Sequence, residues 1–164
     1  MTEEHFDPYL TLEALESRRV NYVLIGAFAR VIQGTEELTR GVDLAPSGRG
    51  DNLSRLAAAL EDLDAVGADG TPVALEATAV LDLRGRGGEL KIVANPAGTR
   101  GGYDDLRRAA SREPLGRGLR PLVASIGDLA RMAAALGRER DMVPLRQLRI
   151  LADLDRGRVR GVER

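Results

Sequence analysis

The spacing of apolar residues alternates between a helical and an extended pattern along the chain. Leu53, Leu56 and Leu60 repeat at helical spacing behind Asp51, a residue type that caps helices, whereas Val20–Ile25 is a run typical of a buried strand. The same criteria predict helices over 8–19, 27–33, 51–60, 103–111, 125–136 and 140–154, and strands over 20–25, 42–45, 78–83, 89–94 and 121–124. This alternation predicts an α/β (α+β) fold with a mixed β-sheet flanked by helices.

A hairpin is expected in the middle of the chain. The strands predicted over 78–83 and 89–94 flank a glycine-rich turn, Gly85–Gly88. With that turn, Asp82 becomes the cross-strand neighbour of Lys91, and both side chains point to the same face of the sheet. We therefore expect a carboxylate and an ammonium group side by side on this hairpin.

Length and composition exclude several classes of protein. A chain of 164 residues suits a single domain, which we assign to residues 1–155, followed by a flexible C-terminal tail over 156–164. Aromatic residues are only 3%, so the core is expected to be aliphatic and platforms for base stacking are not expected. The absence of cysteine excludes disulfides and cysteine nucleophiles, and no apolar run approaches the roughly 20 residues that span a bilayer. The acidic start lacks a signal-peptide pattern, so we expect a cytoplasmic protein.

Charge is unevenly distributed, although the net charge is only −1. Residues 1–83 sum to −9, residues 84–120 to +5 and residues 121–164 to +3. A basic second half can attract phosphate, or it can be a solvated surface. Arg107 and Arg108 on the helix predicted over 103–111 have the same two interpretations, contacts to an RNA backbone or simple surface charge. Of the 24 basic side chains, 23 are arginine, and Lys91 is the only lysine.

Four segments carry a further pattern. They are a strand, glycine turn and short helix over 22–34, the stretch Thr39-Arg40-Gly41-Val42-Asp43, the run 91–98 before 103–106, and Gly137-Arg138-Glu139-Arg140-Asp141 within 125–141. In this order the segments resemble the nucleotidyltransferase superfamily. The similarity is to its small bacterial AbiEii/MenT-like branch, which is associated with toxin–antitoxin systems. The resemblance covers roughly residues 20–155.

The resemblance implies a single-domain nucleotidyltransferase-like fold in which Gly26, Ala27 and Arg40 contact a nucleoside triphosphate. In that family an Asp-x-Asp pair and a third acidic residue on a neighbouring strand hold two Mg²⁺ ions, which clamp the triphosphate and activate the attacking hydroxyl. This chain keeps only Asp43 of the three carboxylates. Gly41 and Lys91 stand at the other two positions. The expected ligand is therefore a nucleotide, and the expected Mg²⁺ site is impaired.

Lys91 has three interpretations at this stage. Asp43 and Asp82 can neutralise its ammonium, so that the former metal site is an ion-pair cluster. Asp82 can instead replace a missing ligand, so that some metal binding survives. As a third alternative, Lys91 extends to solvent from a surface strand and Asp82 is an ordinary solvated partner.

Three functional hypotheses follow from these residues. The leading one is a pseudoenzyme that binds a nucleotide, an RNA such as tRNA, or a protein partner, with Gly26, Ala27, Arg40 and Lys91 at the nucleotide and Arg107, Arg108 and Arg138 at phosphate. The first alternative is an active Mg²⁺-dependent enzyme that moves a nucleoside monophosphate to an RNA 3′ end or a protein hydroxyl, with Asp43 and Asp82 as ligands. The second alternative is a structural or antitoxin-like subunit. The sequence indicates no oligomeric state.

Overall fold

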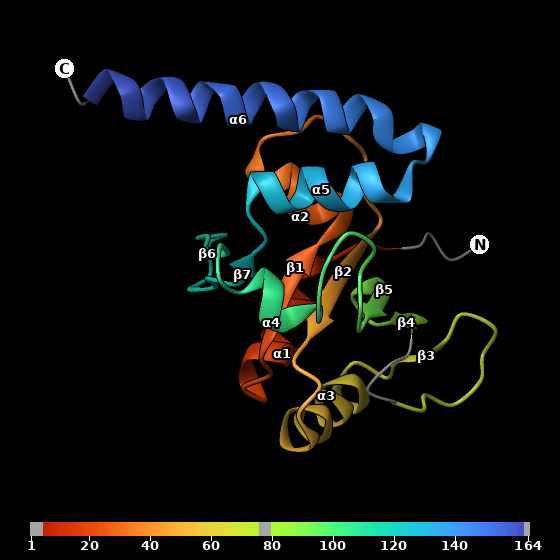
Figure 1. The fold of residues 1–164 in the computed structure, drawn as a ribbon. Helices are drawn as coiled ribbons and strands as arrows, with labels where there is room; N and C mark the ends of the chain where they lie inside the picture. The colour runs from red at the N-terminus through yellow and green to blue at the C-terminus, as the bar shows by residue number, and fades with distance from the viewer. Residues whose placement is uncertain (1–4, 76–79, 163–164) are drawn as a thin grey trace.

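Seven strands of the computed structural model form one mixed sheet within the described residues, 5–75 and 80–162 (Figure 1). The strands are β1 (Tyr22–Ile25), β2 (Gly41–Pro46), β3 (Val66–Gly67), β4 (Val80–Gly85), β5 (Gly88–Val93), β6 (Ser111–Arg112) and β7 (Leu122–Val123). Their order across the sheet is β3-β4-β5-β2-β1-β7-β6. The β2–β5 and β1–β7 pairs are parallel and the other pairs are antiparallel, so the predicted mixed sheet is confirmed.

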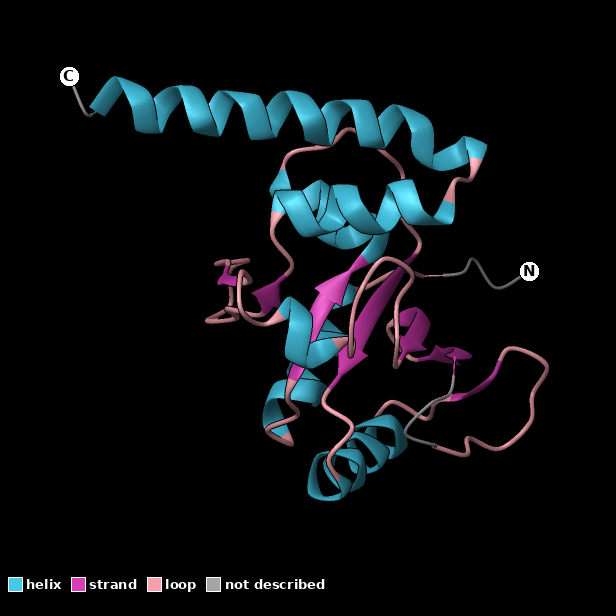
Figure 2. Cartoon of the chain, in the orientation of Figure 1, coloured by secondary structure: helices cyan, strands magenta, loops and turns pink. Residues whose placement is uncertain are grey.

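The helices lie at two ends of the central strands (Figure 2). They are α1 (Pro8–Ser17), α2 (Gly26–Gln33), α3 (Gly50–Asp62), α4 (Tyr103–Leu106), α5 (Ile126–Leu136) and α6 (Met142–Val162), with a short 3₁₀ helix over Glu139–Asp141 between the last two. Helices α2, α5 and α6 stack beside one end of β1 and β2, and α1 and α3 lie beside the other end. The loop that follows α2 and the turn between α5 and α6 therefore lie at the same end of the sheet.

Helix starts follow local capping chemistry in two of three predicted cases. The amide of Tyr9 donates to Asp7 Oδ1 at 3.1 Å at the start of α1, and the amide of Asp128 donates to Ser125 Oγ at 3.0 Å at the start of α5. Asp51 is expected to cap α3 and does not, because the helix begins at Gly50 with Arg49 at the cap position. Its carboxylate instead accepts a hydrogen bond from Arg55 at 3.3 Å, one turn along.

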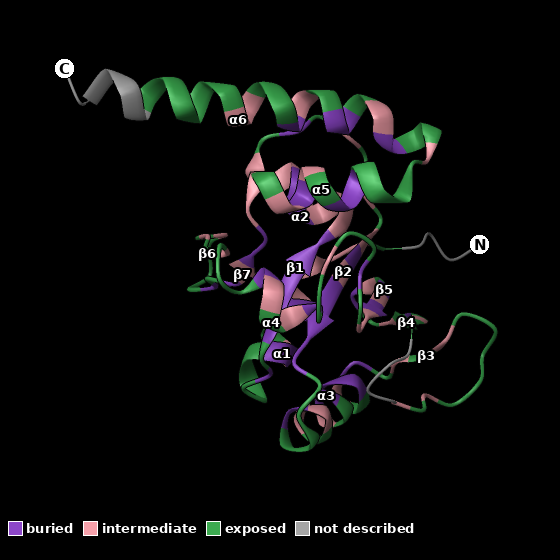
Figure 3. Ribbon diagram, viewed as in Figure 1, coloured by how far each residue is buried: buried purple, intermediate pink, exposed green. Residues whose placement is uncertain are grey.

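The core is aliphatic, as the composition predicts. Val23, Leu24, Val42 and Leu44 on the two central strands are fully buried. Leucines from four helices close over them, namely Leu12, Leu15, Leu56, Leu129 and Leu148 (Figure 3). Because both central strands are held between these layers, the side chains at their ends are fixed in place for the site described below.

The predicted hairpin is confirmed with its register. Strands β4 and β5 are antiparallel, Gly85 pairs with Gly88, and Asp82 pairs with Lys91. Of the strand predicted over 78–83, positions 78 and 79 lie outside the described residues.

Two predicted helices end elsewhere. The helix expected over 103–111 is only the single turn α4, because the chain then returns to the sheet and Ser111 pairs with Val123. The last helix does not end at 154 but continues to Val162, through most of the segment assigned to a tail. Its charged residues keep helical spacing there, and Asp153 pairs with Arg156 one turn on. Gly157 therefore lies within the helix and does not end it.

Candidate functional site

Three charged side chains stand in a row across adjacent strands. Asp43 on β2 pairs in register with Lys91 on β5, and Lys91 pairs in register with Asp82 on β4. Cross-strand partners share one face of a sheet, so the ammonium group rises from the strand between the two carboxylates. We call Asp43, Lys91 and Asp82 the carboxylate–lysine row.

The carboxylate of Asp43 lies against the first residue of α2. Gly26 has a positive φ of 72°, and a Cβ built there would overlap the Asp43 carboxyl group. Only glycine allows both this backbone conformation and this close approach. The sequence marked Gly26 as a phosphate-binding position, and the structure adds that it is also the residue that makes room for Asp43.

Burial governs the ionisation of Asp43. Loss of hydration raises the pKa of its carboxyl group above the ordinary value, and the negative charge of Asp82 adds to the rise. The cations of Lys91, Arg30 and Arg138 act in the opposite direction without cancelling it. The row therefore holds a carboxylate whose negative charge is incompletely compensated by the protein, a condition common at binding and catalytic sites.

Lys91 is half-buried and faces this cleft from an inner strand. Among the described residues its ammonium makes no hydrogen bond and no ion pair within 4.0 Å of a carboxylate. It acts on Asp43 through space, as the largest of the cationic influences on that carboxyl group. The ammonium thus keeps its three hydrogen-bond donors available within the cleft.

On the opposite side of the cleft, the polar side chains form hydrogen bonds with one another. Arg30 is 7% exposed and donates twice to Glu37, from Nε to Oε2 and from Nη2 to Oε1, both at 2.8 Å. Thr35 Oγ1 donates to the same carboxylate at 2.7 Å. Asp141, 1% exposed, accepts from Arg138 Nε at 2.6 Å and from Arg30 Nη2 at 3.5 Å. We call these five residues the Arg30 network. It ties the loop after α2 to the α5–α6 corner.

A cavity of 780 Å³ lies between the row and the network. Its charged lining is balanced, six basic and six acidic side chains: Arg30, Arg40, Arg84, Lys91, Arg138, Arg140, Glu36, Glu37, Asp43, Asp82, Glu89 and Asp141. A smaller cavity of 260 Å³ adjoins it at Asp43 and Lys91, and its walls are mostly apolar, including Val93, Leu129 and Met132. Asp43, Lys91 and Arg138 line both cavities.

Most of the residues singled out from the sequence meet at the larger cavity. Its lining includes Gly26, Ala27, Arg40, Asp43, Asp82, Lys91 and Arg138. Arg107 and Arg108 do not line it. Arg107 lies over the ring of Tyr103 at 5.9 Å and pairs with Asp104 at 3.8 Å on an exposed turn. Sequence reasoning did not single out Arg30, Thr35 or Glu37, because nothing in their spacing indicated that the loop folds back on α2.

The residues present do not fit a two-metal site. Within the described parts of the chain, no group of three or more acidic or histidine side chains could hold a metal ion. Lys91 adds a positive charge between the two nearest carboxylates. A Cβ at Gly41 would lie 2.7 Å from the carbonyl oxygen of Glu89, so the position of the family's first aspartate is closed by the neighbouring strand.

The comparisons with known proteins agree on the fold. No protein-family model matches the chain, and no curated protein matches its sequence. The solution structure of the antibiotic-resistance factor ANT(2'')-Ia is similar with a TM-score of 0.60 and 14% identity, over 95% of this chain and 92% of that one. The crystal structure of TM1012 from Thermotoga maritima, assigned as a nucleotidyltransferase, is similar with a TM-score of 0.59 and 16% identity, over 87% and 94% of the two chains. No helix in the described ranges has both the length and the apolar character to cross a membrane. Together, these two structures and the mixed sheet show that the chain has a nucleotidyltransferase fold.

Proposed function

We propose that this chain is a pseudoenzyme that binds nucleoside phosphates without a metal, using the ammonium of Lys91 where an active relative would use Mg²⁺. The observation that carries the proposal is the carboxylate–lysine row. Lys91 stands in register between Asp43 and Asp82, lines the cleft, and has no hydrogen-bonded partner among the described residues. A half-buried cation with its donors available is suited to a phosphate oxygen.

Other groups around Lys91 support a phosphate ligand. Arg40 and Arg138 line the same cleft and can hold further phosphate oxygens. The first turn of α2, at Gly26 and Ala27, presents backbone N–H groups without a side-chain cap. The apolar cavity beyond Lys91 can accept an uncharged group such as a nucleobase. These contacts fit a nucleotide, either free or at the end of an RNA such as tRNA.

The alternative of an active Mg²⁺-dependent transferase rests on Asp43 and Asp82, which share one face of the sheet. Their separation by Lys91 counts against it. A divalent ion 4 Å from an ammonium is repelled by about 8 kcal/mol at an effective dielectric constant of 20, an upper-end value before relaxation. We therefore prefer a binding function, in the bacterial cytoplasm and in a toxin–antitoxin-like setting as the resemblance implies.

Calorimetric titration with ATP, CTP, GTP and UTP, each in Mg²⁺ and in EDTA, tests the proposal. We expect at least one nucleotide to bind with an affinity that EDTA does not reduce. Lys91→Met should weaken that binding about 10- to 100-fold, the value of a charged hydrogen bond. Arg107→Ala removes a cation outside the cleft and should leave binding unchanged. Binding that requires Mg²⁺, or no binding in either condition, would overturn the proposal.

A further inference from the structure

Helix α6 carries apolar residues on two faces, of which one is buried and the other is largely exposed among the described residues. Leu145 and Leu148 are buried where α6 lies across α5, and they form its inner face. Figure 1 shows that the later turns of α6 project past α5 and the rest of the molecule. Figure 3 shows that these projecting turns are largely exposed. The exposed apolar residues along α6 need a separate explanation.

The outward side chains follow a spacing of four and three residues. Val143, Ile150 and Leu154 are 55%, 60% and 57% exposed. Gln147, whose Oε1 accepts a hydrogen bond from the amide of Glu36 at 2.9 Å, and Gly157 fill the remaining positions of a seam that repeats each seven residues, the pattern by which two helices pack along their length. Ile150 and Leu154 lie on successive turns of this seam, on the side away from Leu148. We call these five residues the outer seam.

Charges beside the outer seam indicate what covers it. Arg146 and Asp153 lie on the same edge of the seam, two helical turns apart. If a second α6 packs antiparallel against the seam, Arg146 of each chain lies opposite Asp153 of the other, which gives two such pairs per dimer. The described structure gives Arg146 no ion pair within 4.0 Å, and Asp153 has only the exposed pair with Arg156. Exposed pairs within one helix contribute little, so Asp153 remains available.

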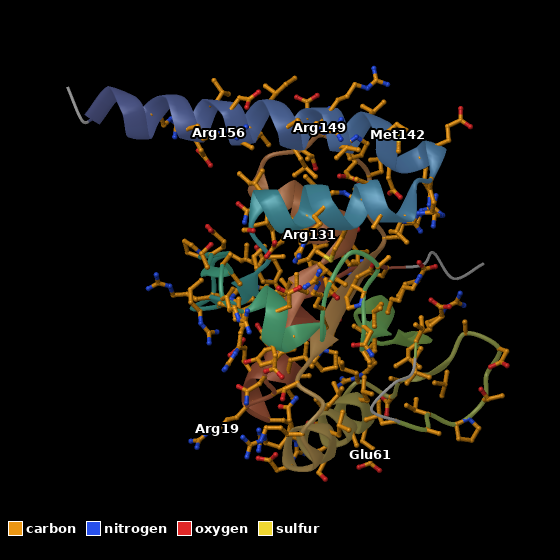
Figure 4. All side chains as sticks on the ribbon, in the orientation of Figure 1. Arg19, Glu61, Arg131, Met142, Arg149 and Arg156 are labelled. Atoms are coloured by element: carbon orange, nitrogen blue, oxygen red, sulfur yellow. The ribbon has the colours of Figure 1, made fainter. Side chains whose placement is uncertain are left out.

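The length of α6 suits such a pairing. Its 21 residues extend for about 31 Å, long enough for three heptads. Figure 4 shows the labelled residues Met142, Arg149 and Arg156 distributed along the helix from the α5 corner to the projecting end. Val143, the first residue of the outer seam, also lines the 780 Å³ cavity. A second copy on this face would therefore lie close to the mouth of the cleft.

We propose that α6 is a self-association surface, on which a second copy of this chain packs antiparallel through Val143, Ile150 and Leu154, with Arg146 and Asp153 paired across the two-fold axis. The proposal does not depend on what the cleft binds. It rests on the outer seam of α6, which is largely exposed. Arg146 and Asp153 beside the seam have opposite charges and can pair between two copies.

Light scattering after size-exclusion chromatography, over a concentration series, tests the association. We expect the wild-type mass to rise from that of one chain to that of two. Ile150→Glu combined with Leu154→Glu should abolish the rise, because it sets carboxylates in the seam, while the circular dichroism spectrum stays unchanged. Leu136→Glu alters an exposed leucine, 45% exposed, that lies outside the seam, and should leave the dimer intact. A wild type that is monomeric at every concentration, or a dimer that survives the seam variant, would overturn the proposal.

A charge-exchange experiment tests the antiparallel pairing. Arg146→Asp alone and Asp153→Arg alone each place like charges opposite one another and should weaken the dimer about tenfold. The double variant, and an equimolar mixture of the two single variants, should both recover it, because each arrangement again pairs Arg with Asp. Failure of both to recover would contradict the antiparallel arrangement. Circular dichroism of each single variant checks that the helix is retained.

Discussion

The two sides of the cleft differ in whether their charged side chains are hydrogen-bonded to one another. In the Arg30 network both carboxylates, Glu37 and Asp141, accept at least two hydrogen bonds, with distances from 2.6 to 3.5 Å. In the carboxylate–lysine row the charges are neighbours by register, yet Lys91 bonds to neither carboxylate and burial raises the pKa of Asp43. Both sides are built from arginine or lysine with aspartate or glutamate, so composition does not distinguish them.

This contrast separates structure from function. Charges that satisfy one another have their role within the fold, and a ligand gains little by contacting them. A cation and a carboxylate held close without bonding retain interactions that a ligand can complete. The comparison therefore assigns Arg30, Thr35, Glu37 and Asp141 to stability and the carboxylate–lysine row to binding, while Arg138, which bonds to Asp141 through Nε, keeps its Nη groups for a ligand.

The largest expected effect is on the network. Arg30→Met leaves the half-buried Glu37 without its cation and removes the more distant of the two cations at buried Asp141, so it should lower the free energy of unfolding by about 3 kcal/mol. Arg49→Met, which breaks the exposed pair with Asp51 at 3.6 Å, is the matched control and should cost less than about 1 kcal/mol. Urea denaturation followed by circular dichroism measures both. Equal, small losses would show that the network does not stabilise the fold.

Next in size is the strand contact at Gly41. Gly41→Asp adds the family's missing carboxylate, but its Cβ meets the backbone of Glu89 at 2.7 Å. Separating β2 from β5 should cost about 1–3 kcal/mol, the usual range for overpacking. Lys91→Asp alone requires no such separation of the strands, and its cost is electrostatic, because it replaces the main cation near Asp43 by a third carboxylate. If thermal melting shows Gly41→Asp to be as stable as the wild type, the position is not closed and a metal site could be rebuilt there.

A smaller effect concerns pH and the row itself. Because the pKa of Asp43 is raised in the folded state, its ionisation destabilises the fold, and this penalty develops as pH rises from the unfolded pKa to the folded one. Asp43→Asn should therefore gain stability relative to the wild type as pH increases through the acidic range, and the difference should be constant above it.

Asp62 is the matched control, since the pKa of its carboxyl group is lowered by the hydrogen bond from Arg18. Asp62→Asn should show the opposite sign. The wild type gains from the ionised carboxylate above the unfolded pKa and loses that gain as pH falls through the folded pKa. Unfolding curves at several pH values compare the two variants. If the stability difference from the wild type changes with pH in the same direction for both variants, the charge of Asp43 is not undercompensated in the folded protein.

The pairing of Asp82 with Lys91 was predictable from the sequence, because it depends on a local turn. The glycine turn sets the hairpin register, and the register alone brings Asp82 beside Lys91. The parallel pairing of Asp43 with Lys91 was indicated only by the resemblance, since it joins strands far apart in the chain. A short turn pattern specifies the first pairing because it is local, whereas no short pattern specifies the second.

Tertiary contacts explain what the sequence did not predict. The Arg30 network depends on the loop after α2 folding back, and no spacing of Thr35 or Glu37 indicates this. The helix predicted over 103–111 ends early because Ser111 joins the sheet edge. Helix α6 continues beyond 154 although glycine, here Gly157, normally weakens helices. The sequence shows Gly41 only as a missing ligand, because its close contact with Glu89 joins two strands that are far apart in the chain.

The most direct test of the central claim is the metal dependence of nucleotide binding before and after Lys91→Asp. Wild-type protein should bind nucleotide equally well in Mg²⁺ and in EDTA, because the ammonium supplies the positive charge. The variant sets three aspartates in register across β2, β5 and β4, so it should lose binding in EDTA and recover it in Mg²⁺. A wild type that needs Mg²⁺, or a variant that binds as well as the wild type in EDTA, would contradict the account.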